Sequence, residues 1–154
     1  MRYWFDTEFI ERPHTIDLIS IGIVSTDSRI YYTESSETDW TQASPWVLDN
    51  VRPFLTGDGI PRAQIASDIL GFVGDDPTPE FWAYFADYDW VVFCWLFGTM
   101  MDLPAHFPMF CRDVKQLAVT LGDPPLPPQT TLEHHALHDA LWTRDAHRSL
   151  DRTV

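Results

Sequence analysis

The sequence RYWFDTEF at residues 2–9 predicts the first strand of a β-sheet, because it is rich in aromatic residues and carries no helix-cap signal. The sequence IDLISIGIV at residues 16–24 is richer still in β-branched residues and predicts a second strand. Turn-forming residues at 25–28 lead into a third extended stretch at 29–35. Three consecutive strands with short links predict an antiparallel meander.

Helical patterns alternate with short strands in the rest of the chain. Ser44 followed by Pro45 is typical of a helix start, and Pro61 opens a second helical pattern. The elements that we expect after the meander are, in order, helices at 44–54 and 61–72, a strand at 78–85, an apolar helix that starts at Asp87 or Asp89 and ends before Gly98, a short strand at 107–111, a helix at 113–121, a loop at 123–129 and a final helix at about 135–150. In the last helix, Leu137, Ala140 and Leu141 are expected to face the core.

This order predicts an α/β fold with a central mixed sheet, in which parallel strands extend the antiparallel meander and helices flank both. A length of 154 residues suits one substantial core, so we expect residues 1–154 to form a single domain. The hydrophobic content of 45% is typical of a packed globule rather than a disordered chain.

The chain is strongly acidic, with 10 basic and 23 acidic residues and a net charge of −13. This excess argues against an extended basic surface for gripping long nucleic acid, since such binding uses many phosphate contacts. The acidic charge is compatible with an enzyme that binds only one end of a nucleic acid through metal ions, because carboxylates and divalent cations neutralise one another. The binding of any nucleic acid is then expected to depend only shallowly on salt.

Other features predict a cytoplasmic protein. Asp6 and Glu8 interrupt any N-terminal hydrophobic segment, and the longest apolar run, Trp90–Phe97, is too short to span a bilayer. Cys94 and Cys111 have no CxxC spacing and are expected to be reduced thiols in the core.

Asp6 and Glu8 are the first candidate functional residues. They lie two apart on one predicted strand, so their side chains point to the same face, between Trp4 and Ile10. A solvated sheet edge would explain the pair as well. If both carboxylates are buried, their repulsion requires a cation or a proton between them.

Asp89 is the second candidate, just after the predicted strand at 78–85. An aspartate at a helix start is most often a cap. A carboxylate at the carboxyl end of a strand, however, lies where open α/β sheets bind their ligands. Asp87, two positions earlier, competes for the same role.

The third candidate region is the sequence HHALHDA at residues 134–140. Asp139 is expected in the first turns of the last helix, with His134 at its entrance. Several interpretations are open: His134 as a capping group, Asp139 as a charge that favours the helix dipole, the histidines as polar surface, or His134 and His138 as a zinc-binding pair. No HExxH motif is present.

In chain order, Asp6 with Glu8, then Asp89, then His134 with Asp139 resemble the motif of the DEDDh 3′–5′ exonucleases. Each piece alone is a weak signal, whereas the three together, in order and on suitable elements, form a strong one. The expected order of strands and helices also fits the ribonuclease H-like fold of that superfamily.

A closer resemblance covers nearly the whole chain. The chain is similar to the small mycobacterial-type 3′–5′ exoribonucleases at residues 3–11, 14–22, 82–83, 88–89, 103–104, 108 and 134–140. The resemblance implies action on RNA 3′ ends, with a preference for single strands or 3′ overhangs, release of 5′-monophosphates and a tendency to form homodimers.

The resemblance also implies a two-metal hydrolysis of phosphodiesters with Mg²⁺ or Mn²⁺, the hard cations that carboxylates suit. It places Asp6 on both cations. Glu8 and Asp139 complete one cation site, and Asp89 supports the other. His134 is then the general base that takes the proton of the attacking water, since imidazole titrates near neutral pH.

Thr7 and Phe9, on either side of Glu8, are candidate substrate contacts. Phe9 would stack on the terminal base or sugar, although a place in the core would explain it as well. Two alternative functions are open. A DNA 3′–5′ exonuclease would use the same metal site and differ only in contacts to the 2′-hydroxyl. A non-catalytic domain of the same fold would bind nucleotides or a protein partner.

Overall fold

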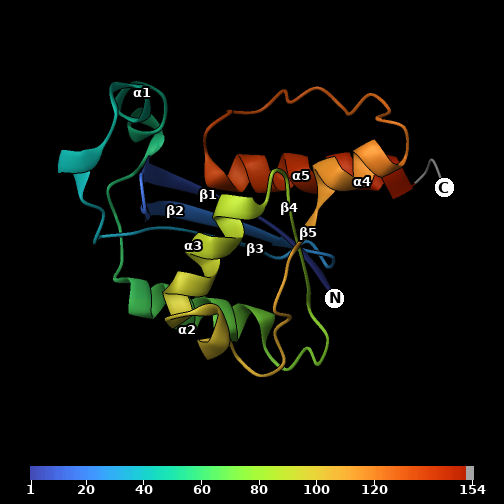
Figure 1. Cartoon of the computed structure of the whole chain (residues 1–154), viewed down its shortest axis with the longest axis horizontal. Coiled ribbons are helices and arrows are strands. Elements are labelled where there is room, and N and C mark those ends of the chain that lie inside the picture. The colour runs from blue at the N-terminus through green and yellow to red at the C-terminus, as the bar shows by residue number, and fades with distance from the viewer. Residues whose placement is uncertain (152–154) are drawn as a thin grey trace.

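The antiparallel meander expected from the sequence forms one half of a mixed five-stranded sheet (Figure 1). The computed structural model describes residues 1–151. The strands are β1 (Arg2–Arg12), β2 (Thr15–Ser25), β3 (Ile30–Glu34), β4 (Glu80–Ala83) and β5 (Arg112–Asp113), in the sheet order β3-β2-β1-β4-β5. Because β4 runs parallel to β1, and β5 parallel to β4, the predicted α/β fold with a mixed sheet is confirmed.

Helices cover both faces of this sheet (Figure 1). They are α1 (Pro45–Asn50), α2 (Arg62–Val73), α3 (Asp87–Phe97), α4 (Val114–Thr120) and α5 (Ala136–Asp151), with short 3₁₀ helices η1 (Trp40–Gln42), η2 (Arg52–Phe54) and η3 (Met100–Asp102). The predicted cap is present, since the Ser44 side chain accepts a hydrogen bond from the Val47 N–H and Pro45 opens α1. No helix among residues 1–151 is long and apolar enough to cross a membrane.

Three sequence expectations were wrong in detail. The strand predicted at residues 107–111 is a loop, and the parallel pairing comes later, at Arg112 and Asp113. The apolar signal of that segment reflects the buried Phe107, whose ring lies 5.2 Å from that of Phe81. The strand expected at 78–85 is only Glu80–Ala83. In α5 the small Ala136 and Ala140 are fully buried, whereas Leu137 and Leu141 are only half-buried.

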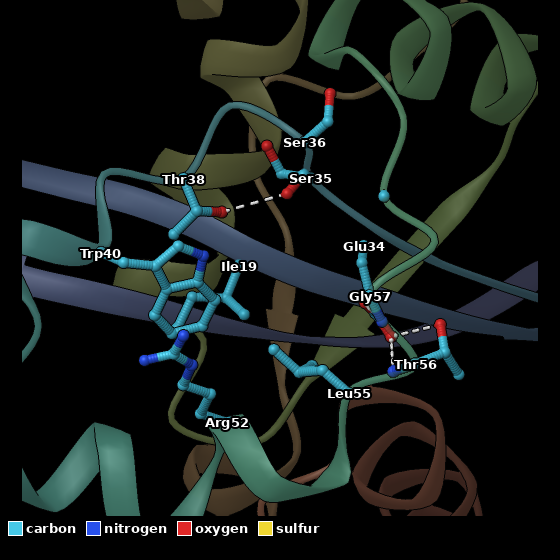
Figure 2. A pocket seen from close by; sticks show the side chains of 11 residues that line it. Ile19, Glu34, Ser35, Ser36, Thr38, Trp40, Arg52, Leu55, Thr56 and Gly57 are labelled. Carbon is cyan, nitrogen blue, oxygen red and sulfur yellow. Dashed lines mark hydrogen bonds between the residues drawn. The ribbon is translucent and has the colours of Figure 1, made fainter.

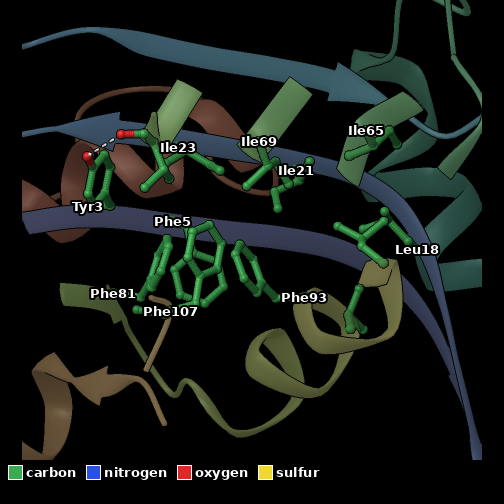
Figure 3. Packing of buried hydrophobic residues seen from close by; sticks show 14 of the residues in the cluster. Tyr3, Phe5, Leu18, Ile21, Ile23, Ile65, Ile69, Phe81, Phe93 and Phe107 are labelled. Atoms are coloured by element: carbon green, nitrogen blue, oxygen red, sulfur yellow. Dashed lines mark hydrogen bonds between the residues drawn. The ribbon is translucent and has the colours of Figure 1, made fainter. Parts of the chain in front are cut away.

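The main core lies between the sheet and helices α2 and α3. Figure 3 shows aromatic and branched side chains from β1, β2 and these helices meeting there, with Phe5, Phe81 and Phe93 at the centre. Ring centroids of Phe81 and Phe93 are 4.9 Å apart, and both side chains are almost completely buried. A smaller cluster under α4 and α5 contains Trp4 and Trp82. These two layers fix β1 from both sides.

The start of α5 rests directly on β2 at Gly22. A Cβ at this position would lie only 2.4 Å from the backbone nitrogen of Leu137 and 2.5 Å from the carbonyl group of Ala136. Glycine is therefore required by the close approach of two backbones. Gly22 pairs with Asp6 on β1, so the same contact brings the first turn of α5 beside the candidate acidic residues.

Both cysteines are free thiols in the described part of the chain. Cys94 is buried and Cys111 is half-buried. Burial raises the pKa of the Cys94 thiol to about 11, and burial together with the nearby Asp89 raises that of Cys111 to about 12. Neither thiol is therefore poised as a nucleophile near neutral pH.

We predict that Gly22→Ala destabilises the protein by about 3 kcal/mol, the upper end of the usual cost of overpacking, because neither backbone can retreat cheaply. Urea denaturation followed by circular dichroism measures the free energy of unfolding. The matched control is Gly71→Ala, at an exposed position in α2 where an added Cβ meets no atom within 4 Å. That variant should gain about 0.5–1 kcal/mol from helix propensity. Equal stability of the two variants would contradict the close contact.

Candidate active site

All five residues singled out by the sequence motif line one cleft. The cleft has a volume of about 340 Å³ and lies where β1, the first turn of α3 and the start of α5 meet. Its lining includes the carboxylates of Asp6, Glu8, Asp89 and Asp139 and the imidazole of His134. Residues that are up to 133 positions apart in the sequence, Asp6 and Asp139, therefore share one cavity.

The carboxylates of β1 stand next to an irregularity in the sheet. Asp6 pairs with Gly22 and Glu8 with Ser20, but Phe9 pairs with Leu18, so Ile19 has no partner in the register. Such a β-bulge bends a strand and re-aims its side chains. Asp6 and Glu8 are each partly buried, which is inconsistent with the alternative of a solvated edge.

Asp89 is held in the cleft by Thr7. The Thr7 N–H donates to Asp89 Oδ1 at 2.9 Å and the Thr7 hydroxyl donates to the same oxygen at 2.6 Å. Asp89 is only 6% exposed, and α3 begins after Ala86 with no side-chain cap, so the cap interpretation was wrong. The competing Asp87 is exposed and does not line the cleft.

The start of α5 brings His134 and Asp139 to the other side of the cleft. Ligand atoms of Glu8, His134 and Asp139 all lie within 4.8 Å of one another. His134 has a left-handed backbone conformation with φ of 63°, and its ring meets the edge of Trp46 at a centroid distance of 4.8 Å. The amide of Gln129 donates to Asp139 Oδ1.

The geometry does not support the zinc pair formed by His134 and His138. His134 groups with two carboxylates, whereas the His138 ring packs against His135 at 4.9 Å. Among residues 1–151, His138 belongs to no group of three potential metal ligands.

Burial raises the pKa of every carboxyl group in the cleft, and repulsion between the carboxylates raises those of Asp6 and Glu8 further. The pKa of Asp6 lies well above its usual range, first through burial and then through Asp89, Glu8 and Asp139. Burial and the charges of Asp139 and Asp89 raise the pKa of Glu8 to about 8. Burial, and to a lesser extent the charge of Asp113, raise the pKa of Asp89 to about 6 against the lowering effect of its Thr7 hydrogen bonds, and burial raises that of Asp139.

This donor set fits hard divalent cations. Four oxygen-donor side chains deprived of water repel one another, and a cation would relieve both the desolvation and the repulsion. Two divalent cations would balance the four negative charges. The residues present therefore meet the chemical requirements of the magnesium or manganese site expected from the sequence.

Aromatic side chains surround the acidic groups. Trp46, Tyr84 and Phe85 were not identified from the sequence, whereas Tyr88 lies in a segment of the family resemblance and Phe9 was a predicted substrate contact. Phe85 is 63% exposed and has a left-handed φ of 57°, an unusual conformation for a bulky residue. Phe9 contacts the Tyr88 ring at 5.9 Å and also packs against the main core, so the core interpretation holds in part, and stacking on a base stays a prediction. No regular spacing links Trp46, Tyr84 and Phe85, so no sequence pattern pointed to them.

Comparisons with known proteins show which family the chain resembles over nearly its whole length. The family model described as the 3′–5′ exoribonuclease Rv2179c-like domain matches residues 1–150. Two proteins of Mycobacterium tuberculosis, the 3′–5′ exoribonuclease Rv2179c of strain H37Rv and the 3′–5′ exoribonuclease MT2234.1 of strain CDC 1551, are each 44% identical over 146 residues. The alignment covers 91% of this chain and 87% of each relative.

A solved structure shares the fold. A chain in the structure of the yeast NOT1 MIF4G domain co-crystallized with CAF1 superimposes with a TM-score of 0.51, over 92% of this chain and 76% of that one. The identity is 14%, so the likeness concerns the fold alone. It supports the α/β architecture with a helix-flanked mixed sheet and is consistent with the ribonuclease H-like fold.

The raised pKa of Glu8 predicts a loss of stability as the pH rises. In the metal-free protein the folded state keeps a proton on Glu8 up to about pH 8, whereas the usual pKa of this group is 4.5. The folded state therefore binds more protons than the unfolded state between these values, and the free energy of unfolding falls across that window. Glu8→Gln should remove this part of the pH dependence.

The check is a series of urea denaturations from pH 5 to pH 8 in the presence of a chelator. We expect Glu8→Gln to gain stability relative to the wild type as the pH rises. Added Mn²⁺ at pH 8 should stabilise the wild type more than the variant. Parallel pH profiles for the two proteins would show that Glu8 has an ordinary pKa.

Proposed function

The chain belongs to the family of 3′–5′ exoribonuclease Rv2179c-like domains, and we propose that it removes nucleotides from RNA 3′ ends with two divalent cations bound in the acidic cleft. The observation that supports this proposal most strongly is the convergence of Asp6, Glu8, Asp89 and Asp139 on one cavity together with His134. A domain that only binds nucleotides or proteins would not need four desolvated carboxylates with raised pKa values.

We assign the cation-binding role to the four carboxylates. Asp6 would contact both cations, Glu8 and Asp139 would complete one site, and Asp89 would support the other. When bound, the cations would supply electrostatic stabilisation of the phosphoryl oxygens and of the departing 3′-oxygen. Thr7 would orient Asp89, because both of its hydrogen-bond donors are directed to one oxygen of that carboxylate. Direct contact of Thr7 with the substrate stays a prediction.

His134 would act as the general base. It lies in the loop before α5, close to Glu8 and Asp139, and an imidazole can accept the proton of an attacking water near neutral pH. Its left-handed backbone and its contact with Trp46 hold the ring over the carboxylates. Strained conformations of this kind concentrate at functional sites.

The substrate would be single-stranded RNA or a 3′ overhang, and the products 5′-monophosphates. The half-buried Phe9 at the cleft wall is suited to stack on a terminal base without selecting its identity. Homodimer formation, a cytoplasmic location and the organisation of residues 1–154 as a single domain stay predictions.

The direct test uses RNA labelled at its 5′ end. With Mg²⁺ or Mn²⁺ we expect a ladder of products that shorten from the 3′ end one nucleotide at a time, and no products in EDTA. Asp139→Asn and Asp6→Asn should each abolish the ladder, because each removes a cation-binding charge. Matched DNA should be a poorer substrate. Internal cuts, shortening from the 5′ end, activity in EDTA or a preference for DNA would each contradict the proposal.

A second test distinguishes the role of His134 from that of His138. His134→Ala should lower kcat by about 10²–10⁴-fold, the usual contribution of a general base. The matched control is His138→Ala, since this ring packs against His135 instead of joining the carboxylates, and it should stay within a few-fold of the wild type. Steady-state rates on a short RNA measure both. A mild His134→Ala with a severely impaired His138→Ala would place the base elsewhere.

A further inference from the structure

A second cavity lies outside the acidic cleft and shares no lining residue with it (Figure 2). Its volume is about 440 Å³, and its walls come from the end of β3, η1, η2 and the loop at residues 55–59. Figure 2 shows Trp40 and Arg52 on one side, Thr56 and Gly57 on the other, and Ile19 and Leu55 between them. The cavity thus has an apolar floor with polar walls.

Arg52 is the cationic group of this cavity, and it forms no salt bridge with any carboxylate among residues 1–151. Six of the other cationic side chains among residues 1–151 form salt bridges: Arg2, Arg29, Arg62, Arg112, Lys115 and Arg144. The Arg52 guanidinium instead lies over the Trp40 ring, 5.2 Å from its centroid. This contact leaves the guanidinium N–H groups available for an anion.

The carboxylate in the wall of the cavity is already satisfied. Glu34 is only 5% exposed and accepts hydrogen bonds from the Thr56 N–H at 2.7 Å, the Thr56 hydroxyl at 3.0 Å and the Gly57 N–H at 2.9 Å. The Tyr32 hydroxyl donates to it as well, at 3.2 Å. Glu34 therefore fixes the loop, and Arg52 is the charged group with spare hydrogen-bonding capacity.

The shape of the cavity is fixed before any ligand binds. Gly59 lies so close to the end of β3 that a Cβ there would be 2.8 Å from the carbonyl carbon of Ser35. Together with the Glu34 hydrogen bonds, this contact locks both ends of the loop. A preformed cavity avoids the entropy cost of ordering a loop on binding.

One small core cluster links the second cavity to the acidic cleft. Ile19 and Leu55 line the cavity and pack with Val47 of α1 in this cluster. The residue before Val47, Trp46, lines the acidic cleft. The α1–η2 segment therefore contributes lining residues to both, Trp46 to the cleft and Arg52 to the second cavity.

We propose that the second cavity binds an upstream nucleotide of the RNA whose 3′ end occupies the acidic cleft. Arg52 donates to a phosphodiester oxygen, and the sugar or base of that nucleotide lies against Ile19 and Leu55. This inference rests on the proposed function. It gives a chain with a net charge of −13 a local cationic contact for its polyanionic substrate. A free 5′-mononucleotide carries the same phosphate, sugar and base groups, and the test distinguishes binding of the free nucleotide from binding of the RNA.

The test compares Arg52→Gln with Arg148→Gln on single-stranded RNAs from a dinucleotide to an octanucleotide. Arg148 is a matched control, because it also lies over a tryptophan ring, that of Trp4, and forms no salt bridge among the described residues. For each variant we compare kcat/KM on the octanucleotide with kcat/KM on the dinucleotide. In Arg52→Gln we expect this ratio to fall about tenfold because KM for the octanucleotide rises. A tenfold change corresponds to the loss of one charge-assisted hydrogen bond. The salt slope of octanucleotide binding should fall by about 0.7, the value for one phosphate contact on a single strand.

Arg148→Gln should show the wild-type dependence on RNA length. Equal length profiles for the two variants would overturn the proposal. A second outcome would also overturn it: Arg52→Gln is no longer inhibited by adenosine 5′-monophosphate, but its dependence on RNA length matches that of the wild type. That result would identify a site for the free nucleotide. Equilibrium binding of a fluorescent octanucleotide in EDTA adds a readout that does not depend on catalysis. If the wild type shortens no RNA at all, the proposed function fails, and this binding difference still decides whether Arg52 contacts RNA.

Discussion

The contact between the backbones of β2 and α5 at Gly22 is the constraint on which the candidate site depends. Because no side chain stands between them, the first turn of α5 sits directly over the strand pair that carries Asp6. Asp139 and His134 reach the cleft only because this helix starts there. The small Ala136 and Ala140 extend the same close packing along the helix, since both are completely buried. A longer side chain at this interface would separate the two halves of the site.

In the absence of cations the cleft lowers the stability of the folded state. Four carboxyl groups are held together against burial and repulsion, and the raised pKa values of Glu8 and Asp89 record that cost. The main core compensates for it, because β1 is anchored on its other face by aromatic residues such as Phe5. Thr7 belongs to both systems, since it is buried in the strand and fixes Asp89 through two hydrogen bonds. A divalent cation would relieve the repulsion between the carboxylates, and this relief would contribute to the free energy of cation binding.

The sequence predicted the elements with strong local signals. The β-branched run before Ser25, the cap at Ser44 and the period of α2 each specify structure through nearby residues, and all three are confirmed. The motif also identified the four carboxylates and the histidine of the cleft, because order along the chain is part of that pattern. The short strand β5 was misplaced, since two paired residues leave almost no local signal and the buried Phe107 supplied a misleading one. Trp46, Phe85 and Arg52 could not be assigned, because only the tertiary fold places them beside a cavity.

The central claim is that the acidic cleft holds two divalent cations, and anomalous diffraction from crystals soaked in Mn²⁺ with a 5′-nucleoside monophosphate tests it most directly. The account predicts two manganese peaks in the cleft, one between Asp6, Glu8 and Asp139 and one between Asp6 and Asp89. Crystals of Asp139→Asn should lose at least the first. Manganese bound only outside the cleft, or a single ion held by His134 and His138 without the carboxylates, would contradict the account.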